Sequence, residues 1–312
     1  MNVPPTQPTD ASTAAMRARL RPMGIGDILD ETFSLYRENF SLFLSTVAVV
    51  YVPFQIILIL FQLTVFNTAS MSSTRVVSTT NGVTTTTPVI NSGTAAGLAV
   101  GGLLFALIAA IAFILLTAAL AIVISNRYLG RTTTLGQAYN ASFSRLGALV
   151  AAALWIGFRL SLLFLASFIL IGIPFLIYFG VAWTLATQVI VLEGVGGLAA
   201  SGRSRQLIKG YWWKTLGLVI VTGLLVSVIS LVITGIVGGI VGAAVSSFAA
   251  RTIISGLIGL VVGLLLTPIQ FTATTLLFYD LKIRKDAFDL EALASSQQMG
   301  AGMGARASYP QS

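Results

Sequence analysis

The chain has 312 residues, of which 56% are hydrophobic and only 9% are charged, and its formal net charge is +8. A soluble domain carries about 25% charged residues, so this composition excludes an ordinary soluble protein. Cysteine and histidine are both absent, which excludes disulfides, thiolate nucleophiles, imidazole bases and the usual zinc ligands. The basic residues flank apolar runs, and this position favours anionic lipid over nucleic acid as their partner.

Six apolar runs are long enough to cross a bilayer, which takes roughly 20 helical residues. We predict an all-α membrane bundle over residues 23–294, between tails 1–22 and 295–312 that we expect to be disordered. The six spans are expected at about 41–66, 95–124, 147–171, 175–192, 215–236 and 253–279. The glycine-rich residues 237–252 fit either part of a span or an outer interfacial helix, and the sequence leaves both open.

An interfacial amphipathic helix is predicted to lead into three of the spans. In the first, at 25–40, apolar residues recur at intervals of three and four. The second follows Thr134, which with Gln137 has the spacing of a capping box. The third lies at about 198–214. Between the first two spans, Asn81-Gly82 joins two β-prone runs and predicts a short outer hairpin with a type I′ turn.

The distribution of positive charge predicts the orientation. Fifteen of the 18 Lys and Arg residues fall before the first span, after the last, or in the loops 125–146 and 193–214. The opposite loops hold Arg75 and Arg251 alone. Loops rich in Lys and Arg stay on the cytoplasmic side, so we expect both chain ends in the cytoplasm.

Arg159 is the one charge expected deep within a span. An arginine at that depth costs at least about 2.5–3.5 kcal/mol on insertion scales, so a partner or a ligand should compensate for it. No span contains a carboxylate, and Gln55, Gln188 and Gln270, with backbone carbonyls, are the expected partners. One hypothesis is a lipid-phosphate or solute site at these four residues; the other is that Arg159 snorkels or ties helices together, and that the glutamines form interhelical hydrogen bonds.

Several short motifs at the ends of the spans form a candidate cytoplasmic rim. They contain Asp27, Asp30, Arg37, Glu193, Arg203, Trp212, Trp213, Tyr279, Asp280 and Arg284. In this order the motifs resemble the bacterial membrane proteins named after the glycerophosphoryl diester phosphodiesterase membrane domain. The resemblance covers about residues 20–295 and implies a multi-pass protein of the bacterial inner membrane. The namesake proteins carry a separate phosphodiesterase barrel; this chain has neither a barrel nor a histidine for its active site, so the hydrolase activity is not implied.

Two functions therefore remain open. A non-enzymatic lipid-associated or scaffolding protein would bind anionic lipids, and could bind partner proteins, at the rim. A small-solute or lipid transporter would need Arg159 and the three glutamines to converge on one path. The acidic residues lack a nucleophile and a base beside them, so we expect no enzyme, cofactor or metal site. Homo-oligomers are compatible with this sequence.

Overall fold

The computed structural model describes residues 22–71, 73–80, 83–168 and 172–306. Six helical segments within these residues are long and apolar enough to cross a membrane, which is the number predicted. They are Phe40–Thr68 in α3 (Phe40–Met71), α4 (Ser92–Tyr128), α6 (Leu146–Ser167), the segment Gly172–Glu193, α10 (Trp212–Ala244), and Phe248–Lys285 in α11 (Phe248–Arg306). The protein is thus a helical multi-pass membrane protein by length and composition of its helices.

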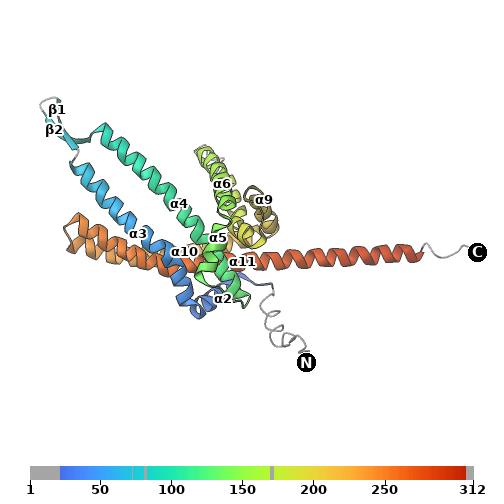
Figure 1. Ribbon diagram of the computed structural model, residues 1–312. Helices are drawn as coiled ribbons and strands as arrows, with labels where there is room; N and C mark the ends of the chain where they lie inside the picture. The colour runs from blue at the N-terminus through green and yellow to red at the C-terminus, as the bar shows by residue number, and fades with distance from the viewer. Residues whose placement is uncertain (1–21, 72, 81–82, 169–171, 307–312) are drawn as a thin grey trace, which may run out of the picture.

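Three shorter helices lie at one end of the bundle: α2 (Ile25–Glu38), α5 (Leu135–Phe143) and α9 (Gly197–Ile208) (Figure 1). We call this the basic end, because Arg131, Arg145, Arg203, Arg205, Lys209, Lys214, Lys282, Arg284 and Lys285 lie there. The predicted capping box starts α5: Gln137 N–H donates to the Thr134 hydroxyl at 3.3 Å, and Thr134 N–H donates to Gln137 at 3.0 Å. These bonds satisfy two amides that the first helical turn leaves free.

Two strands lie at the opposite end, between α3 and α4 (Figure 1). β1 (Ser73–Thr80) pairs antiparallel with β2 (Val83–Ile90), with Ser73 opposite Ile90 and Thr80 opposite Val83. The residues Asn81-Gly82, for which we predict the type I′ turn, lie outside the described residues.

The helices extend beyond the predicted spans. α10 continues through the glycine-rich stretch to Ala244, and α11 starts at Phe248, so most of residues 237–252 belong to two long helices. In lipid every backbone amide needs an internal partner, which favours helix even where glycine weakens it. The fourth span is broken: α7 (Gly172–Ala182) is followed by a turn, the short α8 (Ala186–Gln188) and a π-helical turn, η1 (Val189–Glu193).

The tail predicted to be disordered, residues 295–312, lies partly within the described residues. α11 continues to Arg306, and residues 295–306 are therefore helical. The segment contains Ala, Gln and Met, which favour helix, and no proline, although its three glycines weaken the preference. The other expected tail, residues 1–22, lies almost entirely outside the described residues.

Packing is concentrated at the basic end. Leu120 and Ile124 of α4, Leu185 before α8, and Leu276 and Leu277 of α11 are completely buried. Away from this end the helices diverge (Figure 1), and apolar side chains such as Leu104, Leu162 and Leu231 are exposed. The bundle is therefore closed at the basic end and open to surrounding lipid along the rest of its length.

Candidate functional site

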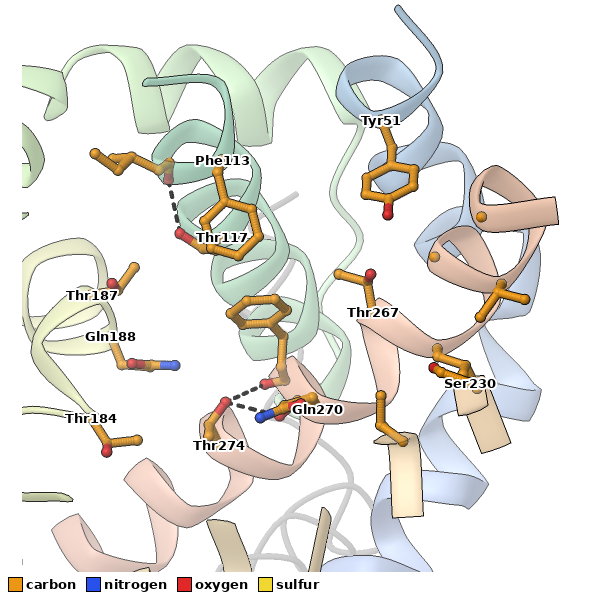
Figure 2. Close-up of a pocket in the computed structure, with 17 residues that line it drawn as sticks. Tyr51, Phe113, Thr117, Thr184, Thr187, Gln188, Ser230, Thr267, Gln270 and Thr274 are labelled. Atoms are coloured by element: carbon orange, nitrogen blue, oxygen red, sulfur yellow. Dashed lines mark hydrogen bonds between the residues drawn. The ribbon is translucent and has the colours of Figure 1, made fainter. Parts of the chain in front are cut away.

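A cavity of about 630 Å³ lies among α3, α4, α8, α10 and α11 (Figure 2). Its wall combines apolar side chains with hydroxyl and amide groups, and none of the described lining residues is charged. The polar lining residues are Tyr51, Thr117, Thr184, Thr187, Gln188, Ser230, Thr267, Gln270 and Thr274. A cavity lined by uncharged polar groups suits an uncharged polar ligand or water.

Several of the hydroxyl protons in this wall are already used. Thr117 donates to the Ile114 carbonyl at 2.9 Å, and Thr274 donates to the Gln270 carbonyl at 3.0 Å (Figure 2). Thr184 likewise donates to the Gly180 carbonyl at 3.1 Å. A hydroxyl whose proton is bonded to its own helix can only accept a further hydrogen bond. These threonines therefore present acceptors to the cavity.

Gln188 adds an acceptor that has no partner. Its side chain is only 3% exposed, and its Oε1 makes no hydrogen bond to any described residue. Gln188 and Gln270 extend into the cavity from opposite sides (Figure 2). A buried amide oxygen without a partner costs about 1–3 kcal/mol, so the site favours an occupant that donates a hydrogen bond.

An apolar cavity of about 520 Å³ lies beside the polar one, between α3 and α4. The two cavities share Tyr51 and Phe113 in their walls. The other lining residues of the second cavity are alanines, Val50, Phe54, Phe105 and Leu116. A polar compartment next to a purely apolar one matches the two parts of an amphiphile.

Arg159 does not belong to this site. Its guanidinium carbon lies 4.1 Å from the centroid of the Trp155 ring, one turn back on α6, and 5.8 Å from that of Trp183. With Trp183 and apolar neighbours it lines a separate cavity of about 280 Å³. The expectation that the glutamines are its partners is wrong; aromatic faces compensate for its charge instead.

Gln55 is also separate from the cavity. It is buried in α3, and its Nε2 donates to the Gly256 carbonyl of α11 at 3.1 Å. This is the interhelical hydrogen bond that one of the two readings predicts. Of the four predicted residues, only Gln188 and Gln270 lie in one cavity.

Asp280 is the centre of the basic end. Its carboxylate is completely buried; it accepts hydrogen bonds from Met23 N–H at 2.7 Å and Arg284 Nε at 3.1 Å, and it is ion-paired with Lys214. The Met23 carbonyl accepts from Lys214 at 2.6 Å and from Arg284 at 2.9 Å. We call these four residues the Asp280 cluster. It fixes the segment before α2 to α10 and α11.

Glu193 forms a second ion-paired group at the end of η1. Arg203 binds both of its oxygens, at 2.8 and 3.2 Å, and Lys282 lies 3.3 Å away. Such bidentate pairs fix geometry, and here they connect η1, α9 and α11. Among the described residues no group of three acidic side chains could hold a metal ion.

The remaining predicted rim residues have separate roles. Asp27 accepts from Gly24 N–H at 2.7 Å at the start of α2, while Asp30 and Arg37 are exposed. Trp212 donates to the Tyr178 carbonyl at 3.2 Å, and Trp213 is 78% exposed. Their positions do not form a single rim site.

Two tyrosine hydroxyls connect helices at the basic end: Tyr279 of α11 and Tyr139 of α5. The Tyr279 hydroxyl shares a hydrogen bond with Ser125. Tyr139 of α5 donates to the Thr46 carbonyl at 2.6 Å, and burial raises the pKa of its hydroxyl to about 12. The neutral hydroxyl therefore ties α5 to α3 at physiological pH.

A family model described as a domain of unknown function (DUF8558) matches residues 135–296. The match covers more than half of the chain. The chain belongs to this DUF8558 family. No curated protein and no solved structure matches it. The DUF8558 region runs from α5 into α11, so it contains Gln188, Gln270 and the ion pairs of Glu193, while α3 and α4 contribute the other wall of the cavity.

Sequence reasoning missed most of the cavity. Its threonines and its serine lie in four separate segments, and a hydroxyl in an apolar helix is ordinary because it can bond its own backbone. The sequence did contain one signal, because threonines cluster around the two glutamines. Thr184 and Thr187 lie shortly before Gln188, and Thr267 and Thr274 lie on either side of Gln270.

Proposed function

We propose that this DUF8558 protein is a non-enzymatic membrane protein that binds a lipid within the bundle. The ligand class that fits is an uncharged lipid whose polar group carries hydroxyl hydrogens. The observation that carries the proposal is the pairing of an acceptor-rich polar cavity with an apolar one across Tyr51 and Phe113. The lipid hydroxyl would bond the Gln188 amide oxygen, and an acyl chain would lie between α3 and α4.

The absence of charge in the lining supports this ligand class. An ionised headgroup placed among neutral acceptors would leave its negative charge without compensation in a medium of low dielectric constant. A hydroxyl donates one hydrogen bond and needs no counter-ion. A volume of about 630 Å³ suits one such polar group with the start of its chains.

A transporter of small solutes is the second candidate, because Gln188 and Gln270 share one cavity. Transport needs the cavity to open at each end in turn. Toward the basic end Leu120, Ile190 and Leu277 are at most 1% exposed, so this packed layer would have to separate. Lipid binding needs no such opening, because the bundle is already open to its sides.

We further propose that the basic end faces the cytoplasm of a bacterial inner membrane, with α2, α5 and α9 at the headgroup level. The positive charges at this end support the orientation. The resemblance to the glycerophosphoryl diester phosphodiesterase membrane domain stays a prediction, as do partner proteins and homo-oligomers.

Native mass spectrometry with lipid extraction tests the binding proposal, on protein purified in mild detergent. Wild type should retain about one hydroxylated neutral lipid per chain. Gln188→Leu should reduce this retention about 3–10-fold, which corresponds to one lost hydrogen bond. Its thermal stability without lipid should stay the same or rise, because the unpaired oxygen is gone. If Gln188 had only a structural role, the variant would retain the lipid as wild type does and would have a lower thermal stability.

Two further variants sharpen the test. Ala109→Leu, in the wall of the apolar cavity, should also reduce retention because it fills space for the chain. Thr64→Val, an exposed threonine that bonds its own helix, should leave retention unchanged. The proposal is refuted if wild type retains no particular lipid, or if all three variants retain it equally.

A further inference from the structure

A separate cavity of about 400 Å³ lies at the basic end, among α4, α5, the start of α6, η1 and α11. It shares no lining residue with the cavity of about 630 Å³ proposed to bind lipid. An inference about this second site is therefore independent of the proposed function. Its charged lining residues are Arg131 and Arg145, and its polar ones are Ser125, Asn126, Ser144 and Tyr279.

Among the residues whose side chains the structure describes, no carboxylate lines this cavity. The nearest acidic residue along the chain is Glu193, next to the lining residue Leu192, and it is already bound by Arg203 and Lys282. Among the described side chains, neither Arg131 nor Arg145 is ion-paired. The cavity therefore carries two positive charges that no described carboxylate neutralises.

The backbone holds Arg145 in place. Its Nη1 donates to the Ile190 carbonyl at 2.6 Å, at the π-helical turn. Gly194 follows with φ 77°, and a Cβ there would lie 3.0 Å from Nη1 and 3.4 Å from Nη2. Glycine is thus needed both for this backbone conformation and for the space that the guanidinium occupies. One of its five N–H groups is used, and π-helical turns are frequent at functional sites.

The Arg131 side chain, unlike that of Arg145, makes no hydrogen bond to the described part of the chain, although its backbone N–H donates to the Asn126 carbonyl at 2.7 Å. It is exposed after the positive-φ Gly130, lines the cavity, and lies near enough to Tyr279 to act on it electrostatically. Two guanidinium groups that line one cavity together with hydroxyls and a side-chain amide form a set of groups suited to a tetrahedral oxyanion.

We propose that this cavity binds a phosphate group. Guanidinium groups bind phosphate oxygens through two parallel N–H bonds, and Asn126 supplies a further donor. A cation would be repelled, and a neutral ligand would leave both charges uncompensated. The phosphate can come from the headgroup of an anionic phospholipid or from a soluble phosphate ester, since the cavity lies at the end of the spans.

Two binding measurements on the full chain distinguish these sources. Inorganic phosphate is titrated against detergent-purified protein freed of phospholipid, with thermal stabilisation as the readout. Separately, the protein is placed in vesicles of phosphatidylcholine with or without phosphatidic acid, and the retained phospholipid is measured by native mass spectrometry after extraction. Binding in the first experiment indicates recognition of the phosphate group itself, and binding only in the second indicates a lipid headgroup.

Arg131→Gln is the decisive variant, because this side chain makes no structural hydrogen bond and the fold should be unaffected. It should weaken whichever binding wild type shows by about tenfold. Arg205→Gln removes the same charge from an exposed position on α9 outside the cavity and should leave binding within about twofold of wild type. The proposal is overturned if wild type binds neither phosphate nor phosphatidic acid, or if the two variants weaken binding equally.

Discussion

At the level of single residues, Asp280 connects three segments at the closed end of the bundle. It is a completely buried carboxylate that binds Met23, Lys214 and Arg284. Replacing one partner in a buried ion pair costs about 3–5 kcal/mol, because the remaining charges stay buried without compensation. We predict that Asp280→Asn destabilises the protein by about 3 kcal/mol.

Thermal unfolding in detergent measures this effect. A loss of that size should lower Tm by roughly 5–10 °C. Asp30→Asn removes an equal charge from an exposed position and should change Tm by no more than about 2 °C. If the two variants behaved alike, Asp280 would not hold the α2 segment to α10 and α11.

Arg159 and Arg145 show two ways of placing a cation without a carboxylate. Arg159 lies over the rings of Trp155 and Trp183, while Arg145 is bonded to a backbone carbonyl. In the first arrangement, cation–π contacts with aromatic rings stabilise the positive charge and join α6 to the fourth span. The second leaves four N–H groups for another partner, and for this reason the phosphate site is inferred at Arg145 rather than at Arg159.

At the level of the helices, the contact of α9 with α6 depends on Gly197. A Cβ at this position would lie 2.1 Å from the Ala148 carbonyl oxygen and 3.1 Å from the Ala152 nitrogen. Both are backbone atoms of a helix, so neither can move aside without displacing α6. Overpacking of this kind costs typically about 1–3 kcal/mol. We predict that Gly197→Ala lowers stability by about 2 kcal/mol or more.

Gly202→Ala is the matched control in the same helix. A Cβ there meets nothing within 4 Å. Alanine also favours helix over glycine by up to about 1 kcal/mol, so this variant should be neutral or slightly more stable. Equal melting temperatures for the two variants would mean that α9 does not lie as close to α6 as the structure places it.

The sequence predicted the long helices well, because hydropathy and length alone determine which segments can cross a membrane. It did not predict the interruption of the fourth span between Ala182 and Glu193, because every residue there is compatible with a continuous apolar helix. It also left open whether residues 237–252 continue a span or form an outer interfacial helix, and the structure continues α10 through its glycines to Ala244. Local composition does not predict where packing against neighbouring helices interrupts or extends a helix.

The site was less predictable than the fold. Gln188 and Gln270 were identified as polar residues in apolar segments, but their grouping depends on how α8 and α11 pack. Trp155 lies four residues before Arg159 and could have been recognised as its neighbour on one helix face. Trp183 could not, since it comes from another span. Arg131 and Arg145 appeared only as topology signals, because their cavity forms from five separated segments.

At the level of the whole molecule, packing and positive charge are concentrated at the same end. The described basic residues of α9, of the loops on either side of α5, and of the ends of α4, α10 and the last span lie there, next to the buried core. The opposite end holds the strands and the α10–α11 connection, with Arg75 and Arg251. If the basic end faces the cytoplasm, the phosphate cavity is accessible to cytoplasmic esters and to headgroups of the inner leaflet.

The orientation can be tested directly because the natural chain has no cysteine. We predict that Ser246→Cys, at the α10–α11 connection, reacts with a membrane-impermeant maleimide added to intact spheroplasts. Gly202→Cys, exposed on α9, should react only after the membrane is permeabilised, because that end should face the cytoplasm. The unaltered chain provides the blank in both conditions. The reverse labelling pattern would show that the bundle has the opposite orientation. The phosphate cavity would then lie on the extracytoplasmic side, and its phosphate ligand would come from the outer leaflet or the extracytoplasmic medium.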